Sequence, residues 1–244
     1  MRHVLIALCT FLPALITTLT PTIALAQDPD PRYVIHIEVD RPVLEPGQTT
    51  EVRLRAGFNS DEFACMAGVA GRLLTSVGGE GFHGHALVAP MNGPGTEPGV
   101  PTETGFSGII AGQISGLGGA MGDPSDPIGY WRVDYTAPIE AVGQTVSLET
   151  ATLRYEMYTE ICYGCTRSES RIGELVEGAA AIRVVACRAD FNGDGRADVF
   201  DFLDFINAYL GGQAAADFDF DGELTVFDFV AFQDRFDRGC EGGG

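Results

Sequence analysis

The chain of 244 residues contains no lysine, and all 15 of its basic residues are arginine. The absence of lysine excludes Schiff-base chemistry and catalysis by a lysine base. Positive charge is scarce altogether, because 34 acidic residues leave a formal net charge of −19. A chain of this charge is not expected to bind nucleic acid or an anionic membrane through electrostatic attraction.

Recognisable catalytic motifs are also absent, since the sequence has no G-x-S-x-G and no H-E-x-x-H. His83 and His85 are predicted to share one face of a strand, but no carboxylate at a suggestive spacing completes a metal site, so we expect both histidines to be simply solvent-exposed. Glu174 and Glu177 are expected to be charges of a solvated turn. We expect a protein that is not an enzyme. A carboxylate pair with O-glycosyl hydrolase activity is the alternative.

Long apolar runs are confined to the N-terminus. Arg2 precedes a largely apolar stretch over Val4–Leu19, and Ala24-Leu25-Ala26 fits a signal-peptidase site before Gln27. We therefore expect residues 1–26 to be a secretory signal peptide. The protein is then secreted, with no membrane insertion, and any attachment to the cell surface is expected to come through a partner.

The most informative pattern is a twelve-residue acidic loop that occurs twice. Oxygen-bearing side chains fall at loop positions 1, 3, 5, 9 and 12 around a glycine at position 6, which is the EF-hand spacing for Ca²⁺. Position 7 is expected to contribute its backbone carbonyl. The sequence therefore predicts two bound Ca²⁺ ions. In loop position order the predicted ligand residues are Asp190, Asn192, Asp194, Arg196, Asp198 and Asp201 in the first loop, and Asp217, Asp219, Asp221, Glu223, Thr225 and Asp228 in the second.

Each loop is followed by a helical pattern. Apolar residues recur at three- and four-residue steps over 202–209 and again over 229–236, and Gly211-Gly212 is expected to end the first helix. Before the first loop, residues 181–186 read as a strand. An ordinary EF-hand has a helix on both sides of its loop, so these repeats have only the exit helix.

A calcium loop with only its exit helix, duplicated within so short a segment, resembles a dockerin domain. Cys187 before the repeats and Gly239-Cys240 after them make residues 187–240 similar to the bacterial GC-type dockerins, whose repeats read like ADFNGDG…FDF. The resemblance implies a small all-α domain that docks in a calcium-dependent manner to a cohesin-like partner. It also implies a setting that often acts on polysaccharides. A disulfide from Cys187 to Cys240 would join the ends of such a domain.

One departure from this family concerns loop positions 10 and 11. In well-studied cellulosomal dockerins these positions are often small or hydroxylated and help to choose the cohesin. Here they are Val199-Phe200 and Val226-Phe227, which argues against a cellulosomal cohesin as the partner. Two interpretations stay open: the aromatic pairs form an apolar docking face, or they pack the two helices together.

Residues 27–186 are long enough for one domain with its own core. Apolar residues alternate with polar ones over 33–39, 52–58 and 131–135, a further strand is expected over 146–158 with a β-bulge near Thr150-Ala151, and 181–185 is a final strand. These strands predict an antiparallel β-sandwich. Its opening, strand then turn then strand, resembles the start of cohesin-like and other immunoglobulin-like modules. Residues 241–244 form a short tail.

The stretch from Gly78 to Pro127 is rich in glycine and proline and is expected to form long surface loops around two short strands, Ala86–Pro90 and Gly108–Ile114. Trp131 is expected in the core. The pairing of Cys65, Cys162 and Cys165 stays open. The alternatives are a local Cys162–Cys165 disulfide, a disulfide from one of these two to Cys65, a redox motif, and zinc held by the three cysteines with His83 or His85.

Three hypotheses for function follow. The first is a secreted, calcium-binding, non-catalytic protein that docks to a cohesin-like partner. The second is a component that binds or degrades polysaccharide. The third treats the calcium loops as a structural staple without a docking partner.

Overall fold

The computed structural model describes residues 33–58, 65–113, 127–158, 167–168 and 175–240. The expected signal peptide, Glu174 and the CxxC cysteines, Cys162 and Cys165, lie outside the described residues. None of the described helices is both long and apolar enough to cross a membrane.

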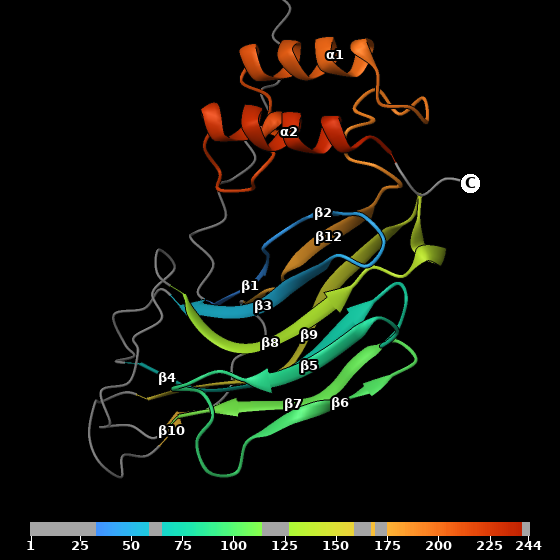
Figure 1. The fold of residues 1–244 in the computed structure, drawn as a ribbon. Helices are drawn as coiled ribbons and strands as arrows, with labels where there is room; N and C mark the ends of the chain where they lie inside the picture. Colours follow the sequence, from blue (N-terminus) through green and yellow to red (C-terminus); the bar gives the residue numbers. More distant parts are fainter. Residues whose placement is uncertain (1–32, 59–64, 114–126, 159–166, 169–174, 241–244) are drawn as a thin grey trace, which may run out of the picture. The chain divides into compact units, whose positions relative to one another are not determined.

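Two β-sheets face each other as the layers of a sandwich (Figure 1). Neighbouring strands pair antiparallel, apart from the two-residue pairings of β1 with β11 and of β2 with β12. In spatial order, sheet A contains β11 (Leu175–Val176), β1 (Tyr33–Val39), β3 (Thr49–Phe58), β8 (Ile128–Thr136) and β5 (Phe82–Leu87). Sheet B contains β2 (Val43–Leu44), β12 (Ala179–Val184), β9 (Thr145–Tyr158), β4 (Cys65–Thr75), β7 (Gly105–Gly112) and β6 (Glu97–Thr102), with β10 (Arg167–Ser168) paired to β9.

Alternation along the strands explains which face of sheet A is buried. Ile35 on β1 and Val52 on β3 point into the core, whereas the outer face carries charged residues of alternating sign. There Arg53 and Arg55 form ion pairs with carboxylates of neighbouring strands, including Glu38. Opposite charges at cross-strand positions stabilise the pairing and keep this face soluble. The predicted β-sandwich is therefore confirmed at the level of two mostly antiparallel sheets.

Trp131 is fully buried, as expected, and its indole Nε1 donates a hydrogen bond to the Pro98 carbonyl at 2.8 Å. Its ring packs against Phe106 with centroids 5.1 Å apart. The sole tryptophan thus belongs to the sandwich core rather than to an exposed sugar-stacking platform.

The prediction that His83 and His85 share one face is wrong. A register irregularity between His83 and Ala86 in the pairing of β5 with β8 turns the two side chains different ways. His83 lies exposed with Nε2 2.8 Å from Thr136 Oγ1, whereas His85 is half-buried with its ring 5.1 Å from that of Phe106. The expectation that both histidines are simply exposed therefore holds only for His83.

Glu177 is exposed in the connection between β11 and β12, as expected, but its carboxylate also has partners on β9. Its carboxylate accepts hydrogen bonds from the Thr152 backbone N–H at 2.6 Å and from the hydroxyl groups of Thr150 and Thr152. These bonds fasten the segment before β12 to β9 and give Glu177 a structural role.

The C-terminal segment contains two helices, α1 (Val199–Leu210) and α2 (Val226–Arg238), with a short 3₁₀ turn, η3 (Ala214–Ala216), between them. A second 3₁₀ turn, η1 (Ile139–Ala141), lies in the sandwich. The exit helices were predicted, and α1 ends before Gly211 as expected. Before the first loop the chain forms β12 rather than a helix.

Aromatic rings hold the two helices together. Phe205 on α1 and Phe232 on α2 are fully buried and stack with ring centroids 4.0 Å apart. Phe218 packs edge-on against both rings. A disulfide joins Cys187 to Cys240, 53 residues apart in the sequence. Because so small a unit buries little core, the covalent closure of its ends contributes to its stability.

Glu45, in the turn after β2, binds both ends of the C-terminal segment. Its carboxylate accepts a hydrogen bond from the backbone N–H of Arg188 at 2.6 Å and pairs with the Arg235 guanidinium, whose Nε lies 2.8 Å from Oε1. Both side chains of the ion pair are mostly buried. Arg235 also donates to the Gly239 carbonyl at the end of α2.

Replacing Glu45 by glutamine is expected to destabilise this attachment by about 3 kcal/mol, because it leaves the mostly buried Arg235 charge without an opposite charge. Denaturant unfolding can be followed by the fluorescence of Trp131 for the sandwich and by helical circular dichroism for α1 and α2. We expect the helical transition of Glu45→Gln to move to lower denaturant, ahead of the tryptophan transition.

The matched control is Glu38→Gln, which removes a half-buried carboxylate from ion pairs with Arg53 and Arg55 at the surface of sheet A. Exposed ion pairs contribute at most about 1 kcal/mol, so this variant should unfold like the wild type. If Glu45→Gln also unfolds like the wild type, the ion pair does not attach the helices to the sandwich.

Candidate metal centre

The first acidic loop gathers three of its predicted ligands. One oxygen from each of Asp190, Asp194 and Asp201 lies within 4.8 Å of the others. Oxygen ligands on opposite sides of a Ca²⁺ ion are about 5 Å apart, twice the metal–oxygen distance. The Asn192 amide joins this group, since its Oδ1 accepts the backbone N–H of Asp194 at 2.8 Å.

Backbone N–H groups fix the loop around the Asp190 carboxylate. Gly193 and Gly195 donate to its two oxygens, each at 2.8 Å. Gly195, at position 6, has φ +92°, and its counterpart Gly222 in the second loop has φ +85°. A side chain is strained at these angles, which is why the sharp turn requires glycine.

The second loop repeats this arrangement. One oxygen from each of Asp217, Asp219 and Asp221 lies within 4.8 Å of the others. Gly222 donates to Asp217 Oδ2 at 3.0 Å, as Gly195 does to Asp190. Residues 27 positions apart (190 and 217) therefore have the same role in the two loops.

Asp201 and Asp228, at position 12, are fully buried and connect each loop to its helix. Asp201 Oδ1 accepts from Asn192 N at 2.9 Å, and its Oδ2 accepts from Asp198 N at 2.8 Å. In the second loop Asp228 accepts from the backbone N–H groups of Phe218 and Thr225. The carboxylates at this position thus also close the capping boxes at the N-termini of α1 and α2.

The residues at positions 9 and 7 have other contacts. Asp198 and Thr225, at position 9, accept the backbone N–H two residues later and act as helix N-caps. The side chains of Arg196 and Glu223, at position 7, are exposed, which is compatible with a role limited to the backbone carbonyl. Among the carboxylates, Asp198 and Asp228 are not part of the three-carboxylate clusters.

One oxygen in the second loop lacks a hydrogen-bond partner within the part of the chain that is described. Asp217 Oδ1 is buried and accepts no hydrogen bond, although the cation of Arg188 lies near enough to interact with the Asp217 charge. A buried carboxylate oxygen without a partner is costly. A cation in the cluster would remove this cost, and oxygen-only donor sets suit hard ions such as Ca²⁺.

The electrostatics of the second loop agree with a crowded set of carboxylates. Desolvation raises the pKa of Asp219, and the charges of Asp228 and Asp221 raise it further. Desolvation also acts to raise the pKa of Asp228. The hydrogen bonds that its carboxylate accepts from backbone N–H groups outweigh this effect and hold the pKa of Asp228 below its usual value. The buried position-12 carboxylate is therefore kept ionised.

The sequence pattern did not reveal that Arg188 contacts the second loop. Its guanidinium lies between the rings of Phe218 and Phe220, 3.8 and 4.1 Å from their centroids, and donates to the Phe218 carbonyl. Burial lowers the pKa of Arg188 to about 10. Phe220 has a φ of +63°, unusual for a residue with a side chain, and the stacked cation holds it in place beside Asp217.

Next to the loops, the helices present a repeated set of exposed apolar side chains, here called the repeated apolar surface. Three positions on α1 match three positions on α2 in both residue type and exposed fraction. They are Val199 (59%), Phe200 (61%) and Leu203 (50%) on α1 and Val226 (61%), Phe227 (66%) and Val230 (54%) on α2. The interpretation that positions 10 and 11 pack the helices together is therefore wrong, because the buried rings at 205 and 232 do so instead.

No family model matches the chain, and no curated protein matches it. Solved structures similar to it are cohesin modules. The seventh ScaB type I cohesin from Pseudobacteroides cellulosolvens has 10% identity and a TM-score of 0.43, covering 62% of this chain and 92% of that one. The cohesin module of a family 33 glycoside hydrolase from Clostridium perfringens has 13% identity and a TM-score of 0.38, covering 63% and 96%. A cohesin–dockerin complex from Clostridium thermocellum has 9% identity and a TM-score of 0.39, covering 66% and 99%.

All three TM-scores are below 0.5 and all identities are below 25%. The likeness concerns the β-sandwich fold alone.

Proposed function

We propose that residues 187–240 are a dockerin-type module that folds around two Ca²⁺ ions and docks to a cohesin-like domain of a partner. The chain as a whole is then a secreted, non-catalytic protein. Docking would bring the N-terminal sandwich to the partner or hold it there.

The observation that carries this proposal is the repeated apolar surface, four of whose six residues occupy positions 10 and 11 of the two acidic loops. In each loop, positions 9 and 12 contact the backbone of the loop and helix, and positions 10 and 11 lie between them. Those middle positions are Val199-Phe200 and Val226-Phe227, and all four side chains are exposed. Exposed aromatic side chains in a repeated arrangement are typical of an interface rather than of a free surface.

Calcium has a defined role in this arrangement. The carboxylates of each cluster repel one another, and a divalent cation offsets their charge. An ion held by the clustered carboxylates of a loop would fix that loop. The position-12 carboxylate, which also closes the capping box, connects the loop to the N-terminus of the helix. The ion therefore orders the same segment that presents the docking residues.

The polysaccharide-binding alternative would place a sugar on the sandwich, and the staple alternative would leave the exposed rings without a partner. A pull-down separates docking from the staple alternative. The full chain is immobilised as bait and incubated with the secreted and envelope fractions of the source organism, first with calcium and then with chelator. We expect a β-sandwich protein to be retained only with calcium. If a bait that folds with calcium retains no partner, the loops are a staple.

A further inference from the structure

Arg188 places a cation beside the second acidic loop. Its guanidinium stacks between the rings of Phe218 and Phe220, which occupy positions 2 and 4 of that loop. The charge of Arg188 interacts with that of Asp217, the position-1 carboxylate. The first loop has Gly193 at position 4 in place of Phe220, so it cannot form the same stack of two rings.

Two hydrogen bonds fix Arg188 in this position. Its backbone N–H donates to Glu45 Oε1 at 2.6 Å, and its Nη1 donates to the Phe218 carbonyl at 3.0 Å. The residue is half-buried, so water and salt screen its charge less than they screen that of an exposed arginine. The cation is therefore held beside the second loop when another cation approaches.

The stack also supports the backbone of the second loop. Phe220 has φ +63°, where Gly193 has φ +81° at the same position of the first loop. A residue with a side chain is strained at such angles, and the contact with Arg188 offsets this strain. Arg188 thus has two separable properties, its contact with the rings and its charge.

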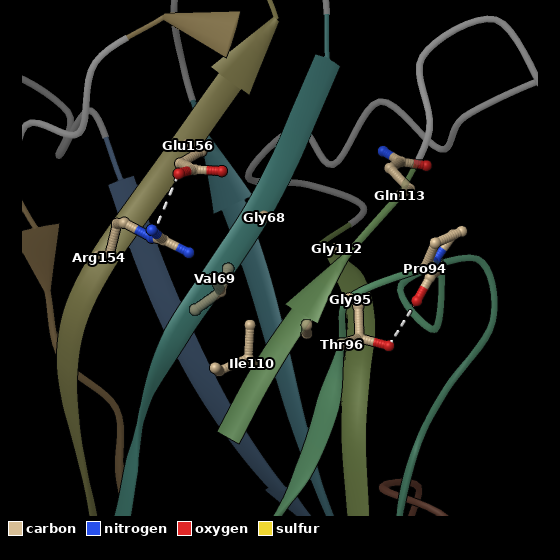
Figure 2. A pocket seen from close by; sticks show the side chains of 12 residues that line it. Gly68, Val69, Pro94, Gly95, Thr96, Ile110, Gly112, Gln113, Arg154 and Glu156 are labelled. Carbon is tan, nitrogen blue, oxygen red and sulfur yellow. Dashed lines mark hydrogen bonds and ion pairs between the residues drawn. The ribbon is translucent and has the colours of Figure 1, made fainter. Parts of the chain in front are cut away.

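The charge of Arg188 acts without occupying the ligand oxygen. Asp217 Oδ1 is buried and accepts no hydrogen bond within the described part of the chain, and a cavity of about 420 Å³ is bordered by both residues. In the small depression of sheet B that Figure 2 shows, by contrast, Arg154 pairs directly with Glu156 at 3.2 Å. Asp217 therefore keeps an oxygen for a metal ion while Arg188 stays in its stack.

A fixed cation next to a calcium ligand has opposite effects on the empty and the filled loop. Without calcium, Arg188 attracts Asp217 and offsets part of the repulsion among the carboxylates. With calcium, the same charge repels the divalent ion. Both effects lower calcium affinity. We infer that Arg188 is a built-in competitor of Ca²⁺, which raises the calcium concentration at which the second loop fills.

This inference rests on the proposed function, because it takes the second loop as a calcium site. Calorimetric calcium titration of the full chain without its predicted signal segment tests it. An Asp190→Ala background removes the position-1 ligand of the first loop, so that the titration reports the second loop. In this background Arg188→Met removes the charge but keeps an unbranched side chain against the two rings. We expect it to bind calcium at least about tenfold more tightly than its parent.

Three further variants separate charge from contact. Arg188→Gln is a second neutral variant that retains a donor for the Phe218 carbonyl, and it should also gain affinity. Arg188→Lys keeps the charge but not the planar stack, and its affinity should change by less than about threefold. Arg183→Met removes the charge of an exposed arginine that borders the same cavity. Because that charge is screened, its removal should also change affinity by less than about threefold.

The outcomes separate this inference from the proposed function. Unchanged or weaker calcium binding in both neutral variants would overturn the inference, as would an equal gain of affinity in Arg188→Lys. If the wild-type chain binds two Ca²⁺ ions and the neutral variants gain no affinity, only the role of Arg188 fails. If the wild-type chain binds no calcium, the proposed function fails with it.

Discussion

Replacing Asp190 and Asp217 together by alanine should abolish the calcium-induced gain of helical circular dichroism. Each residue occupies position 1 of its loop, and each carboxylate accepts the backbone N–H of the position-6 glycine. Calcium affinity depends on the number of charged ligands, so each loop is expected to lose at least about 100-fold in affinity. The position-12 carboxylates then close the capping boxes without support from an ion.

The matched control for this variant is Glu223→Ala. Glu223 is an exposed carboxylate within the second loop, at a position expected to bind calcium only through its backbone. It should retain two calcium ions and the helical response. An unchanged calcium response in the paired aspartate variant would refute the mechanism in which calcium folds the module.

Replacing Phe200 and Phe227 together by alanine should abolish capture of the docking partner while leaving calcium binding intact. Both rings are more than 60% exposed, so their removal costs the fold little. Interface aromatic residues contribute about 2 kcal/mol or more each, so the loss of two should weaken partner binding by more than about 100-fold. Alanine also adds no charge beside the carboxylates of the loops.

Two controls accompany this measurement. Leu210→Ala removes the most exposed apolar side chain of α1, outside the repeated apolar surface, and should leave partner binding unchanged. Leu153→Arg, on β9 of the sandwich, should also leave partner capture unchanged, because Leu153 is exposed and the substitution does not alter α1 or α2. Partner binding that survives in the paired phenylalanine variant would show that docking uses another surface.

The parts of this protein that were predicted correctly are those fixed by local spacing. The loop pattern located the carboxylate clusters, the three- and four-residue steps located α1 and α2, and Gly211 marked the end of the first helix. Strand alternation predicted β1, β3 and β8 because each has one buried face. These features depend on residues within a dozen positions of one another.

The strands that the sequence analysis missed either lack an alternation of polar and apolar residues or interrupt it. β4, the strand of sheet B between β9 and β7, contains Gly68 and Gly71 and has no clean alternation of polar and apolar residues. β6 was expected to be loop, because it contains Pro98 and Pro101, but prolines are tolerated on an edge strand. The bulge in β9 was predicted near Thr150, whereas the register shifts beside Leu153.

The contacts around Glu45 and Arg188 could not be predicted, since they join residues 143 and 190 positions apart. No local pattern specifies such pairs. The sequence also left open whether Phe200 and Phe227 are exposed, because a helical aromatic residue next to a loop fits either a core or an interface. They are exposed because the rings of Phe205 and Phe232 already fill the space between the helices.

Titration of the calcium-free chain with Ca²⁺ is the measurement that decides whether calcium folds the docking module. Calorimetry would count the bound ions while far-UV circular dichroism follows the helices. The account predicts two Ca²⁺ ions per chain, one for each loop, with helical signal that rises as the sites fill. Absence of binding, or binding of two ions without any change in helical signal, would contradict it.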